Sequence, residues 1–137
     1  ENFESFAELL PEDFTPVYLG TNPSEKQLER GLSFEGKTNV KDLIALVSLM
    51  DFLISNDSGI IHIAAALGIG VGAIFGPTVP ALGFTPFGSR HVIIENKDLK
   101  CRPCSLHGPR TCPKKHFKCM LDISPEDVLM QVKKFFE

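Results

Sequence analysis

The sequence predicts an α/β fold in which helices cover both faces of an open parallel sheet. Two observations lead to this prediction. Segments typical of strands and of helices alternate along the 137 residues, as expected when crossover helices join parallel strands. The expected strands are also continuously apolar, as between Val71 and Phe75, and strands of that kind are buried on both faces.

The expected elements follow one another along the whole chain. Strands are expected at residues 15–19, 33–35, 51–55, 71–75 and 92–94, and helices at 6–10, 23–30, 39–50, 60–67 and 125–136. Thr38 or Asn39 can cap the helix at 39–50, and Ser124-Pro125 marks the start of the last helix. Open α/β sheets bind ligands beyond the carboxyl ends of their strands, so polar residues at those ends are the candidate site.

Composition excludes some functions. Hydrophobic residues make up 43% of the chain and charged residues 23%, and the net charge is −3. A chain without a basic excess is not expected to bind nucleic acid. Residues 59–77 are almost uncharged, but three glycines interrupt them, which favours a buried helix, a turn and a strand over a membrane span. No signal peptide is recognised, and the start at Glu1 without a methionine indicates a boundary inside a longer protein.

The main candidate site is the strand-turn-helix at residues 55–62, Ser-Asn-Asp-Ser-Gly-Ile-Ile-His. Free backbone N–H groups and the helix dipole favour an anion at such a helix start, and Gly59 lets a phosphate approach the backbone. Ser58 and His62 share one helix face. Asp57 would repel a phosphate, so it fits the hydroxyls of a sugar. The alternative is that Asp57 or Ser58 only caps the helix and His62 packs on the sheet.

Three further residues are weaker candidates. Lys37 follows a glycine before a helix; it is either a charge near the ligand or, as we favour, a solvated surface lysine. Pro77 and Thr78 follow an expected strand and either shape the pocket wall or form a turn.

Four cysteines, Cys101, Cys104, Cys112 and Cys119, fall within a proline-containing loop. Without a signal peptide, clustered cysteines indicate metal more than disulfides, and four thiolates suit a structural zinc ion. Free thiols or two disulfides remain open.

The residues from Ser55 to Gly68, with the Phe-Gly-Pro-Thr segment at 75–78, resemble the ADP-heptose:lipopolysaccharide heptosyltransferase family, glycosyltransferase family 9. Residues 36–40, the cysteine segments and residues 123–126 fit the same family, so the resemblance covers essentially the whole chain. It implies a GT-B enzyme with two Rossmann-like domains and an active site between them. Residues 1–137 would be the single donor-binding domain, with the cysteine-rich loop at 101–119.

The resemblance implies inverting transfer of heptose from ADP-heptose to a lipopolysaccharide core acceptor, without a catalytic metal or cofactor. Asp57 would hold sugar hydroxyls, and Ser58 and Gly59 the diphosphate. His62 would donate to a phosphate oxygen as charge develops on the leaving ADP. The general base and the acceptor site would belong to an amino-terminal domain, so this chain alone is expected to be inactive. A cytoplasmic location, with peripheral association at the inner membrane, is expected.

The same resemblance puts Thr38 near the adenosine, and it aligns Glu25 loosely with a ribose-binding acid. The chain departs from the family where Val79 replaces an acid between Thr78 and Pro80, and where a phosphate-binding lysine would precede Glu1. Two alternatives are a stand-alone nucleotide-binding or metal-clip interaction module, and a family member that uses another nucleotide sugar.

Overall fold

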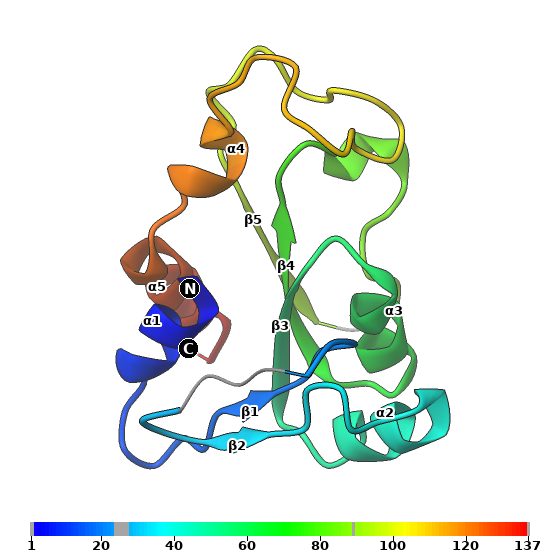
Figure 1. The fold of residues 1–137 in the computed structure, drawn as a ribbon, viewed down its shortest axis with the longest axis vertical. Coiled ribbons are helices and arrows are strands. Elements are labelled where there is room, and N and C mark those ends of the chain that lie inside the picture. Colours follow the sequence, from blue (N-terminus) through cyan, green and yellow to red (C-terminus); the bar gives the residue numbers. More distant parts are fainter. Residues whose placement is uncertain (1, 24–27, 89, 137) are drawn as a thin grey trace.

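The computed structural model describes residues 2–23, 28–88 and 90–136, and it confirms the predicted α/β architecture (Figure 1). The strands are β1 (Val17–Tyr18), β2 (Leu32–Ser33), β3 (Phe52–Asn56), β4 (Gly70–Phe75) and β5 (His91–Glu95). The helices are α1 (Asn2–Glu8), α2 (Val40–Val47), α3 (Gly59–Ala66), the 3-10 helix η1 (Pro80–Leu82), α4 (Lys118–Leu121) and α5 (Pro125–Phe136).

The strands form two parallel sheets in the described residues. The larger has the order β3-β4-β5, with Leu53 opposite Val71 and Ala73 opposite Ile93. The smaller pairs β1 with β2 and lies beside the lower end of β3 in Figure 1. Since every pair is parallel, the polar segments that follow β3 and β4 meet at one edge of the larger sheet.

Helices cover both faces of the larger sheet, as predicted. On one face, residues of β3 and β4 pack against α2 and α3 in a cluster that contains Val47, Leu53, Ile61, Ala64, Val71, Ala73 and Phe75. On the other face, α1 and α5 pack against β4 and β5 in a cluster that contains Phe6, Ile74, Ile94, Ile123, Val128 and Val132. Strand β4, buried along almost its whole length, separates the two clusters.

Two helix starts follow the sequence signals closely. Asn39 caps α2: its Oδ1 accepts bonds from the N–H groups of Lys41 and Asp42, and the Asp42 carboxylate accepts from the Asn39 N–H, which completes a capping box. Ser124 and Asp127 exchange the corresponding bonds before α5. Of the two caps considered for α2, the structure therefore selects Asn39.

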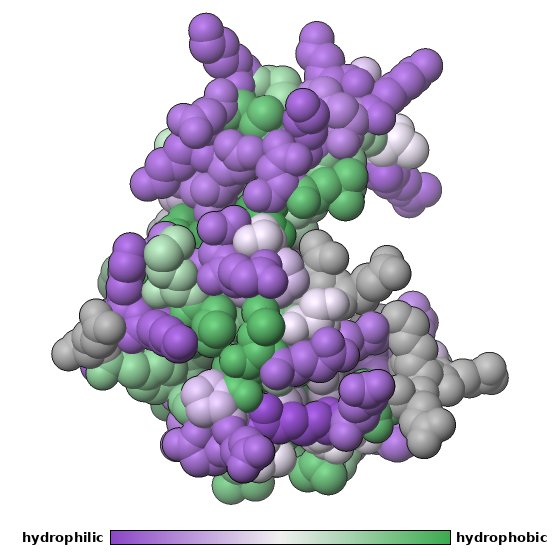
Figure 2. All heavy atoms as spheres, turned by 90° about the vertical axis from the view of Figure 1, so that its left-hand side faces the viewer, coloured by the Kyte–Doolittle hydropathy of each residue, from purple (hydrophilic) through white to green (hydrophobic). Residues whose placement is uncertain are grey.

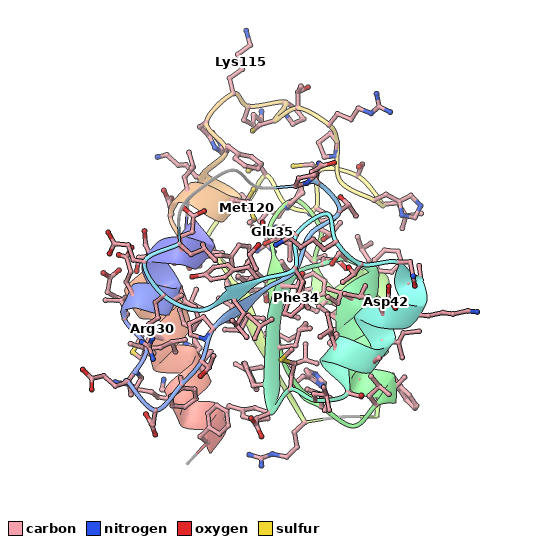
Figure 3. The ribbon with its side chains drawn as sticks, turned by 60° about the horizontal axis from the view of Figure 1, so that its bottom comes forward. Arg30, Phe34, Glu35, Asp42, Lys115 and Met120 are labelled. Atoms are coloured by element: carbon pink, nitrogen blue, oxygen red, sulfur yellow. The ribbon has the colours of Figure 1, made fainter. Side chains whose placement is uncertain are left out.

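The helix expected at residues 23–30 is wrong at its carboxyl-terminal end. Residues 24–27 lie outside the described part of the chain, and residues 28–30 are not helical. The Arg30 guanidinium donates to the carbonyl oxygens of Leu10 (2.7 Å) and Pro11 (2.5 Å) and to that of Phe14, as its position beside the chain after α1 shows in Figure 3. These long-range bonds, with Gly31 at a φ of +98°, override the local helix propensity.

Other differences are smaller. The first helix begins at Asn2 rather than residue 6, and β1 is shorter than the expected strand at 15–19. The sequence did not predict η1 or α4. Among the described residues, no helix is long and apolar enough to cross a membrane.

Candidate functional site

The candidate site lies where β3 ends and α3 begins. Ser58 is the N-cap residue of α3, with extended backbone (φ −159°, ψ 168°), and its side chain makes no capping bond. Its Oγ instead lies 3.2 Å from the Oγ of Ser55. The first N–H groups of α3 therefore lack the side-chain cap that the alternative interpretation required, and they can serve an anionic ligand.

The start of α3 is open to solvent. Ser58, Gly59 and His62 are exposed, and a Cβ added to Gly59 would have no neighbouring atom within 4 Å. His62 lies one turn after Ser58 on the same helix face, and its exposure contradicts the alternative in which it packs on the sheet. The three residues form an accessible surface that combines backbone donors with an imidazole.

The side chain of Asp57 is held by Thr78, which lies in the loop after β4. The Thr78 hydroxyl donates to Oδ2 of Asp57 at 2.7 Å, and the Asp57 N–H donates to the Ile74 carbonyl oxygen at 3.0 Å. Thr78 itself is only 4% exposed. The structure thus brings together two of the predicted residues that are 21 positions apart in the chain.

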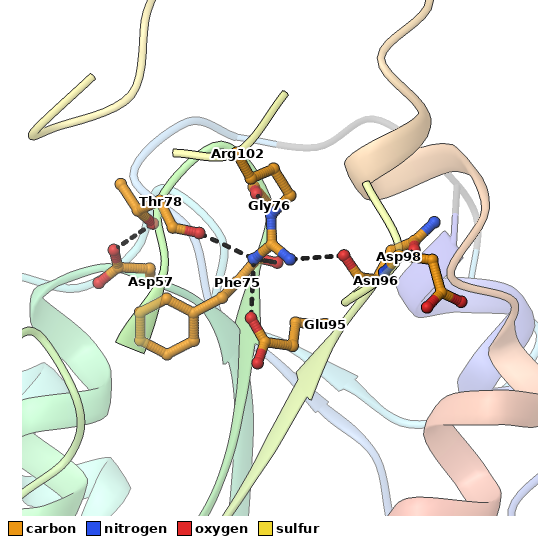
Figure 4. Close-up of polar contacts among 8 residues, drawn as sticks. All are labelled: Asp57, Phe75, Gly76, Thr78, Glu95, Asn96, Asp98 and Arg102. Carbon is orange, nitrogen blue, oxygen red and sulfur yellow. Dashed lines mark hydrogen bonds and ion pairs between the residues drawn. The ribbon is translucent and has the colours of Figure 1, made fainter. Parts of the chain in front are cut away.

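Arg102, which was not among the residues predicted from the sequence, also binds the loop that carries Thr78 (Figure 4). Its guanidinium donates to carbonyl oxygens at the ends of β4 and β5 and forms an ion pair with Glu95 at 3.0 Å. The Arg102 side chain is 3% exposed. No sequence signal distinguishes it from the exposed Arg110 in the same loop, because its acceptors are mostly backbone carbonyls.

The structure links the other predicted residues less directly to Asp57. The Pro77 carbonyl oxygen accepts a bond from the Cys104 N–H at 2.9 Å, so the cysteine-rich loop holds this segment in place. Lys37 is exposed and its Nζ donates to the Ser33 carbonyl oxygen at 3.0 Å. Within the described residues, no hydrogen bond or ion pair links Lys37 or Thr38 to Asp57. Glu25 lies outside the described residues.

The four cysteines are free thiols in this structure. The Cys101 sulfur lies 4.0 Å from Nε2 of His116, and the Cys112 sulfur accepts a bond from the Phe117 N–H at 3.4 Å. That bond is the main cause that lowers the pKa of the Cys112 thiol, whereas burial raises the pKa of Cys119. Among the residues with described positions, no three His, Cys, Asp or Glu side chains converge closely enough to hold a metal ion.

Lysines and arginines cover the outer surface of the cysteine-rich loop. Arg110, Lys114, Lys115 and Lys118 are all exposed. Lys115 points away from the body of the protein in Figure 3. The cysteine-rich loop therefore presents several positive charges to solvent.

An apolar pocket lies on the opposite face of the sheet, between α1, α4 and α5. Its lining contains Asn56 and otherwise apolar residues, namely Phe3, Phe6, Ile74, Met120, Ile123, Pro125 and Val128. Figure 2, which views the side of the molecule with α1 and α5, shows hydrophobic side chains across the middle of this face. A pocket without charged lining residues does not suit a phosphorylated ligand, so the start of α3 remains the candidate site.

Comparison with known proteins gives a consistent result. The model of glycosyltransferase family 9 (heptosyltransferase) matches residues 17–116. Lipooligosaccharide heptosyltransferase 2 of Campylobacter jejuni subsp. jejuni serotype O:6 is 40% identical over 98 residues, which cover 72% of this chain and 30% of that protein. Lipopolysaccharide core heptosyltransferase OpsX of Haemophilus influenzae is 27% identical over 149 residues, which cover 98% of this chain and 43% of that protein.

Solved structures share the fold. The ADP-heptose LPS heptosyltransferase II of E. coli superposes with a TM-score of 0.71 at 22% identity, covering 98% of this chain and 40% of that one. The family 9 glycosyl transferase of Veillonella parvula gives the same TM-score at 21% identity. The chain spans about 30% of the length of the Campylobacter relative.

Proposed function

Because this chain belongs to glycosyltransferase family 9, the heptosyltransferase family, we propose that it is the donor-binding domain of a heptosyltransferase. The enzyme would transfer heptose from ADP-heptose to a lipopolysaccharide core acceptor. One observation carries the proposal beyond family membership: the uncapped, open start of α3 lies next to a carboxylate fixed by Thr78. A diphosphate and a sugar require these two features side by side.

Each residue of the site has a separate role in donor binding. The backbone N–H groups at Ser58 and Gly59 bind the diphosphate, whose negative charge the positive end of α3 stabilises. Asp57 accepts hydrogen bonds from heptose hydroxyls through the oxygen that Thr78 leaves free. Thr38 and Glu25 are assigned by resemblance to the nucleotide end of the donor. Lys37, which is exposed, would contribute a charge near the donor.

In the proposed reaction, an acceptor hydroxyl forms a bond to the anomeric carbon as the bond from that carbon to the phosphate oxygen breaks. The electron pair of the broken bond stays with ADP. Inversion requires the acceptor on the sugar face opposite the diphosphate. His62 and the start of α3 stabilise the charge that develops on the leaving phosphate; this role does not require a metal. The base that takes the acceptor proton and the acceptor site lie outside this chain, and the reaction is expected in the cytoplasm, with peripheral attachment to the inner membrane.

Calorimetry with the full-length protein tests the proposal. We expect ADP-heptose to bind, and Asp57→Asn to weaken its binding by about 10- to 100-fold, because hydrogen bonds to a charged group contribute about 1.5–3 kcal/mol. ADP alone should lose much less affinity, since Asp57 contacts the sugar.

Asp51→Asn is the matched control. Asp51 is an exposed carboxylate just before the other end of the same strand, so this variant should bind the donor as the unchanged protein does. Absence of ADP-sugar binding to the full-length protein would contradict the proposed function. Tighter binding of a different nucleotide sugar would keep the donor-binding role and replace heptose.

We also propose that the cysteine-rich loop binds a structural zinc ion, for which its four thiols would have to converge more closely than they do in this structure. Cys101, Cys104, Cys112 and Cys119 are the proposed ligands, and zinc takes four thiolates in a tetrahedral site. Metal analysis of the full-length protein should find about one zinc per chain, and Cys104→Ser should lose it. His107→Ala, in the same loop but packed on Phe84, should keep it. A metal-free protein of normal stability would overturn this assignment.

A further inference from the structure

Arg102 is the most completely bonded side chain described at the edge of the sheet where the candidate site lies. Its Nη2 donates to the carbonyl oxygens of Phe75 and Thr78, both at 2.8 Å, and its Nε donates to that of Gly76. Its Nη1 donates to the Asn96 carbonyl oxygen at 2.6 Å. One guanidinium therefore joins the end of β4, the loop after it and the end of β5.

Glu95 completes the arrangement. Its carboxylate lies 3.0 Å from Nη2 of Arg102, and the two side chains are 12% and 3% exposed. A buried guanidinium without a carboxylate would lose much of its stabilisation. The planar fork of arginine can serve several acceptors at once, which a lysine ammonium cannot reproduce.

The loop that carries Arg102 makes two more contacts with the segment after β4. The Cys104 N–H donates to the Pro77 carbonyl oxygen, and Gly108 approaches the Pro77 ring so closely that an added Cβ would lie 2.9 Å from its Cγ. The cysteine-rich loop thus contacts Pro77 through Cys104 and Gly108 and contacts Thr78 through Arg102, whose side chain is buried.

These contacts connect Arg102 to Asp57 through Thr78. Arg102 binds the backbone of Thr78, and the Thr78 hydroxyl binds Oδ2 of Asp57 at 2.7 Å; Figure 4 shows both links in one view. Since the Thr78 hydroxyl donates directly to the Asp57 carboxylate, the position of Thr78 influences the direction of that carboxylate. A displaced Thr78 would turn that carboxylate away from the sugar.

We propose that Arg102 is a positioning residue for the donor sugar: through Thr78 it orients the Asp57 carboxylate. The inference rests on the proposed function, because it needs Asp57 to bind the donor. Arg102 itself touches neither donor nor acceptor. Its effect should therefore appear in donor affinity, and it should pass through Thr78.

The test measures donor Kd and KM, kcat and Tm for the full-length enzyme with Arg102→Lys, Thr78→Val and the double variant. Each single variant should weaken ADP-heptose binding about tenfold, with a smaller change in kcat, because one well-placed hydrogen bond is worth about that factor. The double variant should bind ADP-heptose no more weakly than the single variant with the lower affinity, since both changes interrupt the same connection. Arg110→Lys, the same substitution at an exposed site in this loop, should behave as the unchanged enzyme.

The outcomes separate the two proposals. If Asp57→Asn weakens donor binding while folded Arg102→Lys and Thr78→Val bind normally, the positioning role is wrong and the proposed function stands. A lower Tm with unchanged donor Kd would show a purely structural role and would likewise overturn it. Additive losses of donor affinity in the double variant would show that Arg102 does not act through Thr78.

If Arg102→Lys does not fold, the Thr78→Val variant decides the question: normal donor binding by that variant overturns the inference. If Asp57→Asn has no effect, the proposed function fails first.

Discussion

Replacing Phe75 with alanine is expected to lower the free energy of unfolding by about 3–5 kcal/mol, the usual cost of removing a buried aromatic ring. Phe75 is 0% exposed and packs with Ile61 and Ala64 of α3. It ends β4, the middle strand of the larger sheet, so neighbouring strands on both sides restrict any collapse into the cavity. Urea denaturation of the full-length protein, followed by far-UV circular dichroism, measures the change.

Phe87→Ala is the matched control, because the same ring is removed from a side chain that is 91% exposed. It should change stability by less than about 0.5 kcal/mol. Phe75→Leu, which keeps most of the apolar volume, should fall between the two. Equal stability of the Phe75→Ala and Phe87→Ala variants would contradict the assignment of Phe75 to the core.

Phe75 also illustrates what the sequence could predict. Its strand is a continuous apolar run that ends at Gly-Pro-Thr, and such runs identify strands buried on both faces. The Asn39 cap and the end of α3 before Gly68, whose φ is +77°, follow from equally local chemistry. Because these signals depend on neighbouring residues only, the larger sheet, α2, α3 and α5 were predicted almost in place.

The errors share a different cause. Residues 28–30 have a helix-forming sequence, but the Arg30 guanidinium binds carbonyl groups about 20 residues earlier in the chain. Helix α4 is only four residues long, which is too short to produce a periodic pattern. In both places tertiary contacts decide the backbone, and local propensity does not report them.

The candidate site also has one part that local sequence predicts and one part that depends on contacts between distant residues. The polar residues between Ser55 and His62 were predicted because a strand end followed by a helix start is a local pattern. The bond from Thr78 to Asp57 joins residues 21 positions apart. The bonds from Arg102 to the carbonyl oxygens of Phe75, Gly76 and Thr78 span 24 to 27 positions. A single sequence cannot indicate which arginine of a loop turns inward, so the supporting half of the site required the structure.

His62→Ala is expected to lower kcat of the full-length enzyme by about 10²–10³-fold, as removal of one preorganised donor to a developing charge does elsewhere. The Kd for ADP-heptose should change little. In the proposed donor complex, the phosphate oxygen that His62 would contact gains charge only as the bond to the sugar breaks, so the interaction would be stronger in the transition state than in the bound donor. Initial rates at saturating donor and calorimetry together give both constants.

His62→Gln is the informative comparison, because its amide keeps a neutral N–H donor on a side chain of similar reach. Since His62 is exposed one turn into α3, neither variant should lower the Tm noticeably. We expect the Gln variant to keep part of the activity that the Ala variant loses. If His62→Ala instead raises the donor Kd and leaves kcat unchanged, His62 contributes equally to the bound donor and the transition state. Its role would then be donor binding, and the stabilisation of the leaving ADP would have to come from the start of α3 alone.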